Sequence, residues 1–258
     1  MTDFLTRFAP APTGYLHIGH VLNAVYVWGM ARAANGRVLL RIEDHDRQRC
    51  RSEFERALLE DLAWLGFIPD QVVPRQSERE DAYRAAVGPL VAAGLVYGCD
   101  CTRKEAGGAR YAGTCRIRGL PLTDATGWRV RLDPGLKHFR DELLGPQTQD
   151  PAAEFGDVLI RDRRGNWTDQ WAATADDTLQ QITHVIRGVD LLDSTGRQIR
   201  LARLLGRDIP PVFVHHPLIM KSPTQKVSKS DDDTGVRDLR ALGWSPHAVI
   251  AHARRWLT

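Results

Sequence analysis

Apolar positions near the start of the chain follow first a strand-like and then a helix-like spacing. Residues 4–9, with apolar Phe4, Leu5 and Phe8, predict a short strand, and residues 20–34 carry apolar or small side chains on one helical face. Asn35 and Gly36 follow, and both residue types tolerate the left-handed conformation that commonly ends a helix. Residues 38–42 are almost continuously apolar, which is typical of a strand covered on both faces. The opening segment therefore predicts a strand–helix–strand unit.

Two further helices are predicted by serines that precede a glutamate by three positions. Residues 52–55 and 77–80 both have this spacing, in which the serine side chain caps the start of a helix. A stripe of leucines follows the first serine, and Gly66 closes that helix. We expect Gly88 and Pro89 to kink or interrupt the second helix, because proline removes a backbone donor.

The pattern changes in the middle of the chain. Between residues 95 and 169, short strand-like pieces alternate with loops rich in Gly, Pro and Asp, which indicates an inserted subdomain. Strand–helix alternation resumes with a strand at 182–188, a helix at 199–205 and a strand at 210–214. A small helical part ends the chain, where Ser245-Pro246 provides an N-cap and a first-turn proline.

This order of elements predicts an α/β fold: a Rossmann-like parallel sheet with an inserted α+β subdomain and a small C-terminal helical region. Residues 7–20 and 41–46 each include the end of a predicted strand. Since ligands of such sheets bind outside the carboxyl ends of the strands, both segments should face one crevice. The expected divisions are the first half of the sheet, the insert, the second half and the C-terminal region, at 1–90, 91–172, 173–214 and 215–258.

Composition narrows the class of protein. The chain has 258 residues, 43% of them hydrophobic and 26% charged, enough for a sizeable core in roughly two domains. Its apolar runs are short and its first residues lack a long apolar segment, so we expect neither a membrane span nor a secretory signal, and a cytoplasmic protein. Four cysteines do not suggest a disulfide scaffold. A net charge of +3 permits an RNA partner without arguing for one.

The candidate chemistry begins in the turn after the first predicted strand. Pro10, Pro12 and Gly14 make a tight turn, and His17 and His20 stand at the start of the following helix. The first N–H groups of a helix lack internal partners and its dipole end is positive, so this arrangement is suited to bind an anion. Taken alone, a His-x-x-His pair is also what a solvated surface turn would contain.

Two later segments extend this pattern. The second predicted strand runs into RIEDHD (residues 41–46), and the C-terminal region contains KVSKS (residues 226–230). With the histidine segment, these resemble the HIGH and KMSKS signatures of class I aminoacyl-tRNA synthetases. The succession of RFAPAPTGYLHIGH and RIEDHD is similar to the glutamyl-tRNA synthetase branch in particular. The resemblance extends over residues 7–243.

The resemblance implies that an adenylate is formed from an amino acid and ATP, with Mg²⁺. A carboxylate attacks the α-phosphorus, pyrophosphate leaves, and the transition state gathers negative charge that fixed donors and cations stabilise. The second lysine of the family's KMSKS motif is catalytic, and it corresponds to Lys229. A solvated basic loop is the alternative for this segment. The resemblance assigns catalysis to His17, His20, Lys226 and Lys229, and ATP contacts to His17, Gly19, His20 and Lys229.

The implied amino acid is L-glutamate, whose two carboxylates and ammonium need two cationic groups and one anionic group. Arg7 and Arg187 can each bind a carboxylate bidentately, and Glu43 can bind the ammonium. Which arginine takes the side-chain carboxylate stays open. The positions that match amino-acid-binding positions of the family are Arg7, Phe8, Ala9, Pro10, Ala11, Glu43, Asp169 and Arg187.

Asp169 departs from the family pattern, which has a tyrosine at this position. An aspartate beside an anionic substrate repels it unless the aspartate is paired or turned away. Ala173, four residues on, also replaces a larger residue, and Ala11 stands where the family often has serine. These departures bear on the affinity for the amino acid and on its identity.

Three thiols, those of Cys99, Cys101 and Cys115, fall within 17 residues. Zinc favours four tetrahedral ligands, so three cysteines leave one position open. This segment resembles that of the glutamyl-Q tRNA(Asp) synthetases, relatives of glutamyl-tRNA synthetase, in which Tyr111 matches the fourth ligand. The resemblance therefore implies a structural Zn²⁺ in the inserted subdomain. Cys50 lies outside the cluster and is interpreted as a packing or surface thiol.

Only 28 residues follow Ser230, too few for the helical anticodon-binding region of a full glutamyl-tRNA synthetase. The resemblance to the glutamyl-Q family implies transfer of activated glutamate to the queuosine base of tRNA(Asp), with no DNA or membrane partner. Histidines outside the first motif, among them His215 and His216, are interpreted as structural. Two alternatives stay open: an adenylating ligase with another acceptor, such as a small thiol or a carrier protein, and a catalytically weak tRNA-binding module.

Overall fold

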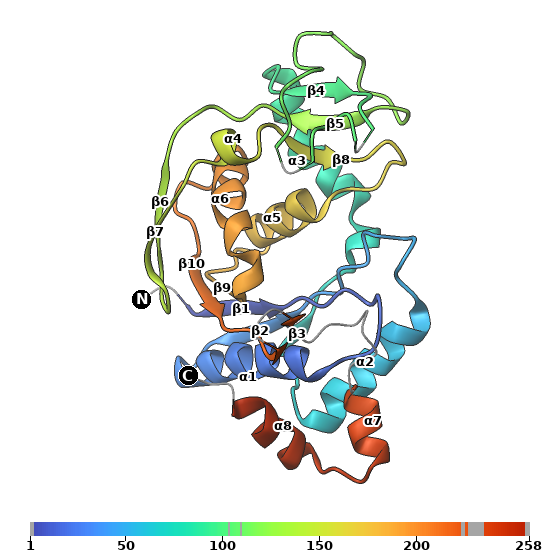
Figure 1. Cartoon of the computed structure of the whole chain (residues 1–258), viewed down its shortest axis with the longest axis vertical. Coiled ribbons are helices and arrows are strands. Elements are labelled where there is room, and N and C mark those ends of the chain that lie inside the picture. Colours follow the sequence, from blue (N-terminus) through green and yellow to red (C-terminus); the bar gives the residue numbers. More distant parts are fainter. Residues whose placement is uncertain (1–2, 103, 109, 223–224, 227–234, 256–258) are drawn as a thin grey trace.

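The molecule is elongated, and its parts follow one another along the vertical axis of Figure 1. The computed structural model describes residues 3–102, 104–108, 110–222, 225–226 and 235–255. A mainly parallel sheet lies in the middle, an antiparallel sheet lies at one end, and two short C-terminal helices lie at the other.

The central sheet confirms the predicted parallel α/β arrangement. Its strands are β1 (Leu5–Phe8), β2 (Arg37–Leu40), β3 (Gln71–Val72), β6 (Lys137–Asp141), β7 (Gly145–Gln149), β9 (His184–Gly188) and β10 (Val212–His216). β2 pairs in parallel with β1 and β3, β10 pairs in parallel with β9 and β6, and β7 runs antiparallel to β6. The two groups of strands meet where the backbone N–H of Thr183 donates to the carbonyl of Leu5 at 2.9 Å, which places β9 beside β1.

Helices cover both faces of this sheet. α1 (Ile18–Ala33) lies on one face, and α5 (Asp169–Leu179) and α6 (Thr195–Leu204) lie on the other (Figure 1). Successive residues of β2 divide between two cores: Val38 and Leu40 pack with α1, whereas Leu39 packs with residues of β9, β10 and α6. This division explains why residues 38–42 are almost continuously apolar, since side chains on both faces of the strand are buried.

The helix α2 (Ser52–Leu65) forms where predicted, but it does not begin with a capping box. Ser52 is already inside the helix, and the N-cap residue Arg51 makes no side-chain cap. The predicted end is confirmed, because Gly66 adopts φ 77° and its backbone N–H bonds back to the last turn.

The next helix, α3 (Glu80–Ala92), also lacks the predicted capping box. Ser77 instead lies in a 3₁₀ turn, η1 (Gln76–Glu78), and its hydroxyl donates to Asp44 at 2.6 Å. The N-cap position of α3 is taken by Arg79, two residues later. α3 continues through Pro89, so the predicted interruption is wrong. A proline removes only one backbone hydrogen bond, which the remaining turns of the helix outweigh here.

The segment between α3 and α5 forms the antiparallel sheet, in the order β4-β5-β8. Its strands are β4 (Val96–Cys99), β5 (Gly127–Val130) and β8 (Val158–Arg161), and the short helix α4 (Pro151–Glu154) precedes β8. Its apolar core is separate from that of the central sheet and contains Trp128, Trp167 and Trp171. The β6–β7 hairpin leaves this sheet and pairs with β10, so the middle of the chain also contributes to the central sheet.

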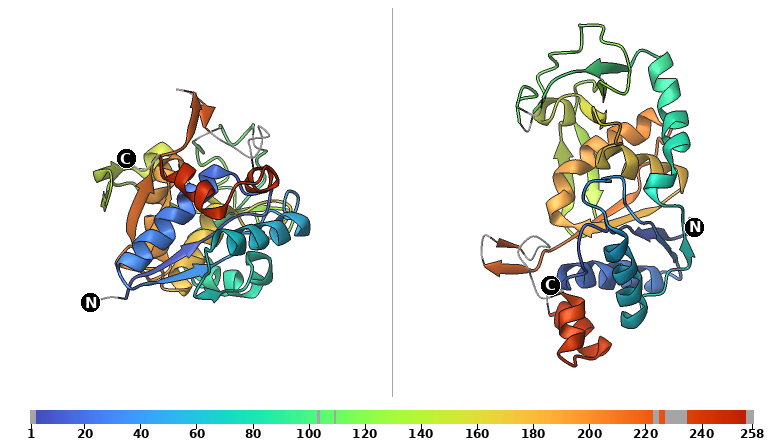
Figure 2. Two further views of the ribbon diagram at one scale, coloured as in Figure 1. Left: turned by 90° about the horizontal axis from the view of Figure 1, so that it is seen from below. Right: turned by 90° about the vertical axis from the view of Figure 1, so that its right-hand side faces the viewer.

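The C-terminal helices α7 (Val236–Ala241) and α8 (Pro246–Arg254) lie below α1 in Figure 1. The predicted N-cap is confirmed, because the Ser245 hydroxyl accepts from the Ala248 N–H at 3.2 Å. The remaining elements are η2 (Val189–Ser194), β11 (Met220–Ser222) and β12 (Gln225–Lys226). The β11–β12 hairpin projects from the body in both views of Figure 2. Among the described residues, none of the helices combines the length and apolarity needed to span a bilayer.

Candidate active site

A cavity of about 390 Å³ lies where the carboxyl ends of β1, β9 and β10 meet the N-terminus of α1. Residues from both motif segments line it, as the strand order predicts. The predicted site residues that line this cavity are Arg7, Phe8, Ala9, Pro10, Ala11, His17, Gly19, His20, Glu43, Asp169 and Arg187. Lys229 lies outside the described residues, and only the backbone of Lys226, in β12, is described.

The two histidines cap the start of α1. The Nδ1 of His17 accepts from the Gly19 N–H at 3.0 Å, and the Nδ1 of His20 accepts from the His17 N–H at 3.1 Å. Because both Nδ1 atoms accept, the neutral rings carry their protons on Nε2, as hydrogen-bond donors. The ring centroids are 3.8 Å apart. Two imidazole donors and the positive end of α1 therefore lie together at the cavity, which suits an anionic ligand.

The chain that follows the KVSKS segment returns to this helix start. Gly235 forms an antiparallel bridge with His17, and the Val236 N–H donates to the Leu16 carbonyl at 2.8 Å. The C-terminal region is thereby attached to the residues that cap α1.

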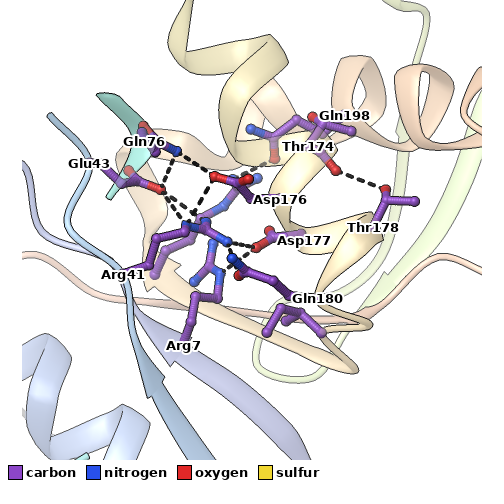
Figure 3. Close-up of polar contacts among 12 residues, drawn as sticks. Arg7, Arg41, Glu43, Gln76, Thr174, Asp176, Asp177, Thr178, Gln180 and Gln198 are labelled. Carbon is purple, nitrogen blue, oxygen red and sulfur yellow. Dashed lines mark hydrogen bonds and ion pairs between the residues drawn. The ribbon is translucent and has the colours of Figure 1, made fainter. Parts of the chain in front are cut away.

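A buried network of ions lies beside the cavity (Figure 3). One carboxylate oxygen of Asp177 accepts from Arg7 Nε at 3.0 Å and from Arg41 Nη1 at 2.8 Å. Arg41 also donates from Nη2 to Glu43 at 2.9 Å. Burial acts to raise the pKa of Asp177, but the two arginines outweigh it and hold that pKa below its usual range. Asp177 therefore stays ionised, as the anchor of two arginines.

The second aspartate of the pair, Asp176, completes the network. It accepts from Arg79 at 2.5 Å, from the Tyr83 hydroxyl at 2.8 Å and from Gln76 at 3.1 Å. Three guanidinium groups and three carboxylates are thus in contact within the network, and their formal charges balance. They belong to Arg7, Arg41, Arg79, Glu43, Asp176 and Asp177.

Arg187 is not a member of this ion network. It is 7% exposed, and its guanidinium donates to His215 Nε2 at 3.0 Å, to Gln198 at 2.6 Å and to the Thr195 hydroxyl at 2.9 Å. None of these partners is a carboxylate. Burial and the charge of Arg7 lower the pKa of Arg187 to about 10, so the side chain remains cationic at neutral pH. A buried cation with neutral hydrogen-bond partners is suited to receive an anionic ligand.

The departure at Asp169 lies inside the cavity. Asp169 is the first residue of α5, it is exposed, and Ala173 one turn later also lines the wall. Burial raises the pKa of Glu43, Arg41 opposes that rise, and the charge of Asp169 adds to it. The cavity therefore contains two carboxylates besides its two arginines, and Asp169 is the one that the family pattern does not include.

Sequence reasoning missed four residues that shape this site: Asp177, Gln198, His215 and His216. Gln198 and His216 line the cavity, whereas Asp177 and His215 hold its two arginines. A signal was present for three of them. The Asp-Asp pair lies on a helix of small residues, and the two histidines end an apolar strand, so polar side chains fall where burial is expected. Gln198 carries no such signal.

The predicted metal ligands come together at the end of β4 and in the segment that connects it to β5. The Sγ atoms of Cys99, Cys101 and Cys115 all lie within 4.8 Å of one another. The Tyr111 hydroxyl is 3.6 Å from the Cys99 Sγ and accepts from the Cys115 N–H at 2.8 Å. Zn–S bonds of about 2.3 Å in a tetrahedron require S···S separations of about 3.8 Å, so this donor set fits Zn²⁺.

Two arginines contact the thiols of this cluster. Arg129 Nε lies 3.3 Å from the Cys99 Sγ, with its guanidinium 3.7 Å from the centroid of the Tyr111 ring, and Arg118 donates to the Cys115 Sγ at 3.4 Å. Burial acts to raise the pKa of Cys99, but hydrogen bonds from Arg129 and Tyr111 outweigh it and lower that pKa. These contacts favour the thiolate of Cys99, the form that binds metal, whereas burial raises the pKa of Cys101 to about 12.

Replacement of Cys101 by serine tests the metal cluster. We expect the Cys101→Ser protein to lose bound zinc and to unfold at a lower temperature, because metal binding stabilises only the folded insert. Metal analysis of the purified protein and thermal melting provide the readouts, with Cys50→Ser as the matched control. Unchanged zinc content and melting in Cys101→Ser would argue against the assignment.

The sequence family described as tRNA synthetases class I (E and Q), catalytic domain, matches residues 3–116 and 126–257. Among curated relatives, the glutamyl-Q tRNA(Asp) synthetase of Burkholderia mallei is 42% identical over 271 residues, covering 100% of this chain and 89% of that protein. The protein of the same name from Rhodobacter capsulatus is 38% identical over 269 residues, covering 94% of this chain and 96% of that protein.

Solved structures agree with this comparison. A glutamate tRNA ligase from Elizabethkingia meningosepticum, crystallised with its amino acid, superposes with a TM-score of 0.77 at 28% identity. A glutamate-tRNA synthetase from Elizabethkingia anophelis gives 0.76 at 28% identity. Each comparison covers 94% of this chain, which spans about half of the longer partner: 53% and 54% of those two chains.

Proposed function

The chain belongs to the class I tRNA synthetase (E and Q) catalytic-domain family and is a ligase, and we propose that it activates L-glutamate with ATP and transfers it to the queuosine base of tRNA(Asp). The observation that carries the proposal is the cavity itself, in which an anion-binding helix start and a buried arginine with neutral partners lie together. The first suits the phosphates of ATP, which binds with Mg²⁺, and the second suits a carboxylate of glutamate.

In the activation step, an oxygen of the glutamate α-carboxylate forms a bond to the α-phosphorus while the bond from that phosphorus to the pyrophosphate oxygen breaks. The products are glutamyl-adenylate and pyrophosphate. Negative charge grows on the phosphate oxygens, and the Nε2–H donors of His17 and His20 are suited to stabilise it. Lys226 and Lys229 are proposed to supply the cationic charge on the other side of the phosphates.

Arg7 and Arg187 differ in their contacts, so we assign them different roles in the amino-acid pocket. Arg7 and Arg41 are already paired with Asp177, whereas Arg187 has neutral partners, so we assign a substrate carboxylate to Arg187. Glu43 remains the proposed partner of the ammonium. Asp169 is proposed to lie near the amino acid, where its charge disfavours a second carboxylate and favours an ammonium.

A zinc ion is proposed to hold the loops of the insert together. Cys99, Cys101, Cys115 and Tyr111 would be its ligands, and the metal supplies structural cross-linking of the loops and no chemistry in the cavity.

The acceptor is proposed from the names of the relatives, which match the chain over most of their length. In the second step, a nucleophile of the acceptor attacks the carbonyl carbon of the adenylate, and AMP leaves. The test is ATP–pyrophosphate exchange with each of the twenty amino acids, without tRNA and then with queuosine-containing tRNA(Asp), followed by labelling of the tRNA. Unmodified tRNA(Asp) is the matched control.

We expect exchange that depends on glutamate and needs no tRNA, and stable labelling of only the queuosine-containing tRNA. Exchange with a different amino acid would overturn the choice of glutamate and would implicate Asp169. Exchange without labelling would favour an adenylating ligase with another acceptor, and tRNA binding without exchange would favour a binding module.

A further inference from the structure

The hydrogen bonds of Arg187 fix the protonation of its neighbour His215. A guanidinium can only donate, so the His215 Nε2 that lies 3.0 Å from Arg187 Nε must accept. The ring proton is therefore on Nδ1, and Nδ1 donates to Asp141 at 2.6 Å. Burial and the charge of Arg187 lower the pKa of His215 to about 4, against the effect of Asp141, so the imidazole is neutral at physiological pH. Arg187, His215 and Asp141 form one chain of hydrogen bonds.

Both carboxylate oxygens of Asp141 accept hydrogen bonds. It is fully buried, with 0% exposure, and it ends β6 at the start of the β6–β7 turn. One carboxylate oxygen accepts from the backbone N–H groups of Leu143 and Leu144 at 3.0 Å each, and the other accepts from the backbone N–H and Nδ1 of His215. Because both oxygens receive donors, the carboxylate cannot rotate without losing bonds, and His215 is fixed with it.

We propose that Asp141 and His215 are positioning residues that orient Arg187 for the carboxylate of the amino acid, an inference that rests on the proposed function. A guanidinium has five N–H bonds, and the bonds to His215, Gln198 and Thr195 occupy three of them. Two remain for a ligand carboxylate, one on each terminal nitrogen.

The neutral imidazole matters for this role. A carboxylate in direct contact with Arg187 would compete with the substrate for the same donors, as Asp177 does at Arg7. His215 provides the rigid acceptor without the opposing charge next to the guanidinium, and the charge of Asp141 is one residue further away. The hydrogen bonds from Asp141 through His215 thus orient the guanidinium of Arg187 without neutralising its positive charge, which can then pair with the ligand.

The test separates positioning from a general structural role by comparing two substrates. In ATP–pyrophosphate exchange, His215→Leu removes the acceptor for Arg187 Nε. We expect the KM for glutamate to rise by about tenfold to a hundredfold, while the KM for ATP changes less than about twofold. His215→Gln supplies an amide oxygen and should recover much of the loss. His184→Leu, which removes a half-buried histidine from the neighbouring strand β9, is the matched control.

Asp141→Asn gives a second line of evidence if the leucine variant does not fold. Both oxygens of Asp141 accept from N–H groups, so an asparagine amide must oppose one donor with another. We expect a smaller rise in the KM for glutamate alone. Equal changes in the two KM values, or an unchanged KM for glutamate, in variants that melt like the wild type would overturn the inference. Absence of glutamate-dependent exchange in the wild-type protein would instead reject the proposed function.

Discussion

Replacement of Lys229 by alanine is expected to lower glutamate-dependent ATP–pyrophosphate exchange by about 10³-fold or more, with the melting temperature unchanged. In the transition state of adenylate formation, negative charge moves from the attacking carboxylate onto the phosphate oxygens, and a cation that contacts these oxygens acts mainly on the rate. Removing one preorganised donor to such a charge costs about 10²–10³ in rate, and removing a full positive charge costs more.

Lys226→Ala is the matched control for this experiment, because it removes the same charge three residues earlier in the same motif. We expect a smaller loss of exchange in this variant. Exchange near the wild-type rate in Lys229→Ala, measured at saturating ATP and glutamate, would contradict the assignment of the catalytic lysine.

Asp177→Ala is expected to have the largest effect on stability. It leaves Arg7 and Arg41, which are 6% and 0% exposed, without the carboxylate that accepts from both. Breaking a buried ion pair by removing one partner costs about 3–5 kcal/mol, which lowers the melting temperature of a domain of this size by about 10 °C. The KM for glutamate should rise as well, since Arg7 loses its anchor.

Asp177→Asn separates charge from shape, because the amide keeps one acceptor oxygen at the same place. Its melting temperature should lie between those of the wild type and the alanine variant. The pKa of Asp177 is lower in the folded protein, so its contribution to stability is present above the unfolded pKa of about 3.9 and is lost as pH falls through the folded pKa. The difference between wild type and Asp177→Asn should therefore shrink below about pH 4. Equal melting of all three proteins at neutral pH would refute the role of this network.

Local sequence patterns were sufficient to predict the β1–β2 and β9–β10 parts of the central sheet and the position of the cavity, but not that β6 and β7 of the predicted insert join the sheet. The segment before the prolines and the apolar run at residues 38–42 are short and bounded by turn residues, which favours strands, and parallel strands place their carboxyl ends together. The helix starts were less predictable. Ser77 has the spacing of a capping residue, yet it bonds to Asp44, which lies 33 positions earlier, and no local pattern indicates that pairing.

The division of labour between Arg7 and Arg187 was also beyond the sequence. Both are arginines next to predicted strands, and their difference depends on Asp177 and His215, which are distant in the chain and adjacent in space. Tertiary contacts determine that Arg7 is paired with a carboxylate and that Arg187 is not. A residue-by-residue comparison with a family motif cannot show this difference.

The contact between β1 and the start of β9 joins parts of the chain that are far apart in sequence, and this affects folding. The Leu5 N–H donates to the Thr183 hydroxyl across 178 positions of sequence. A chain with such distant contacts must close long loops before those contacts stabilise it, and its folding is expected to be slow. During synthesis on the ribosome, the edge of β1 that faces β9 therefore stays uncovered until nearly three quarters of the chain has been made. That interval is when the nascent chain is most exposed to aggregation.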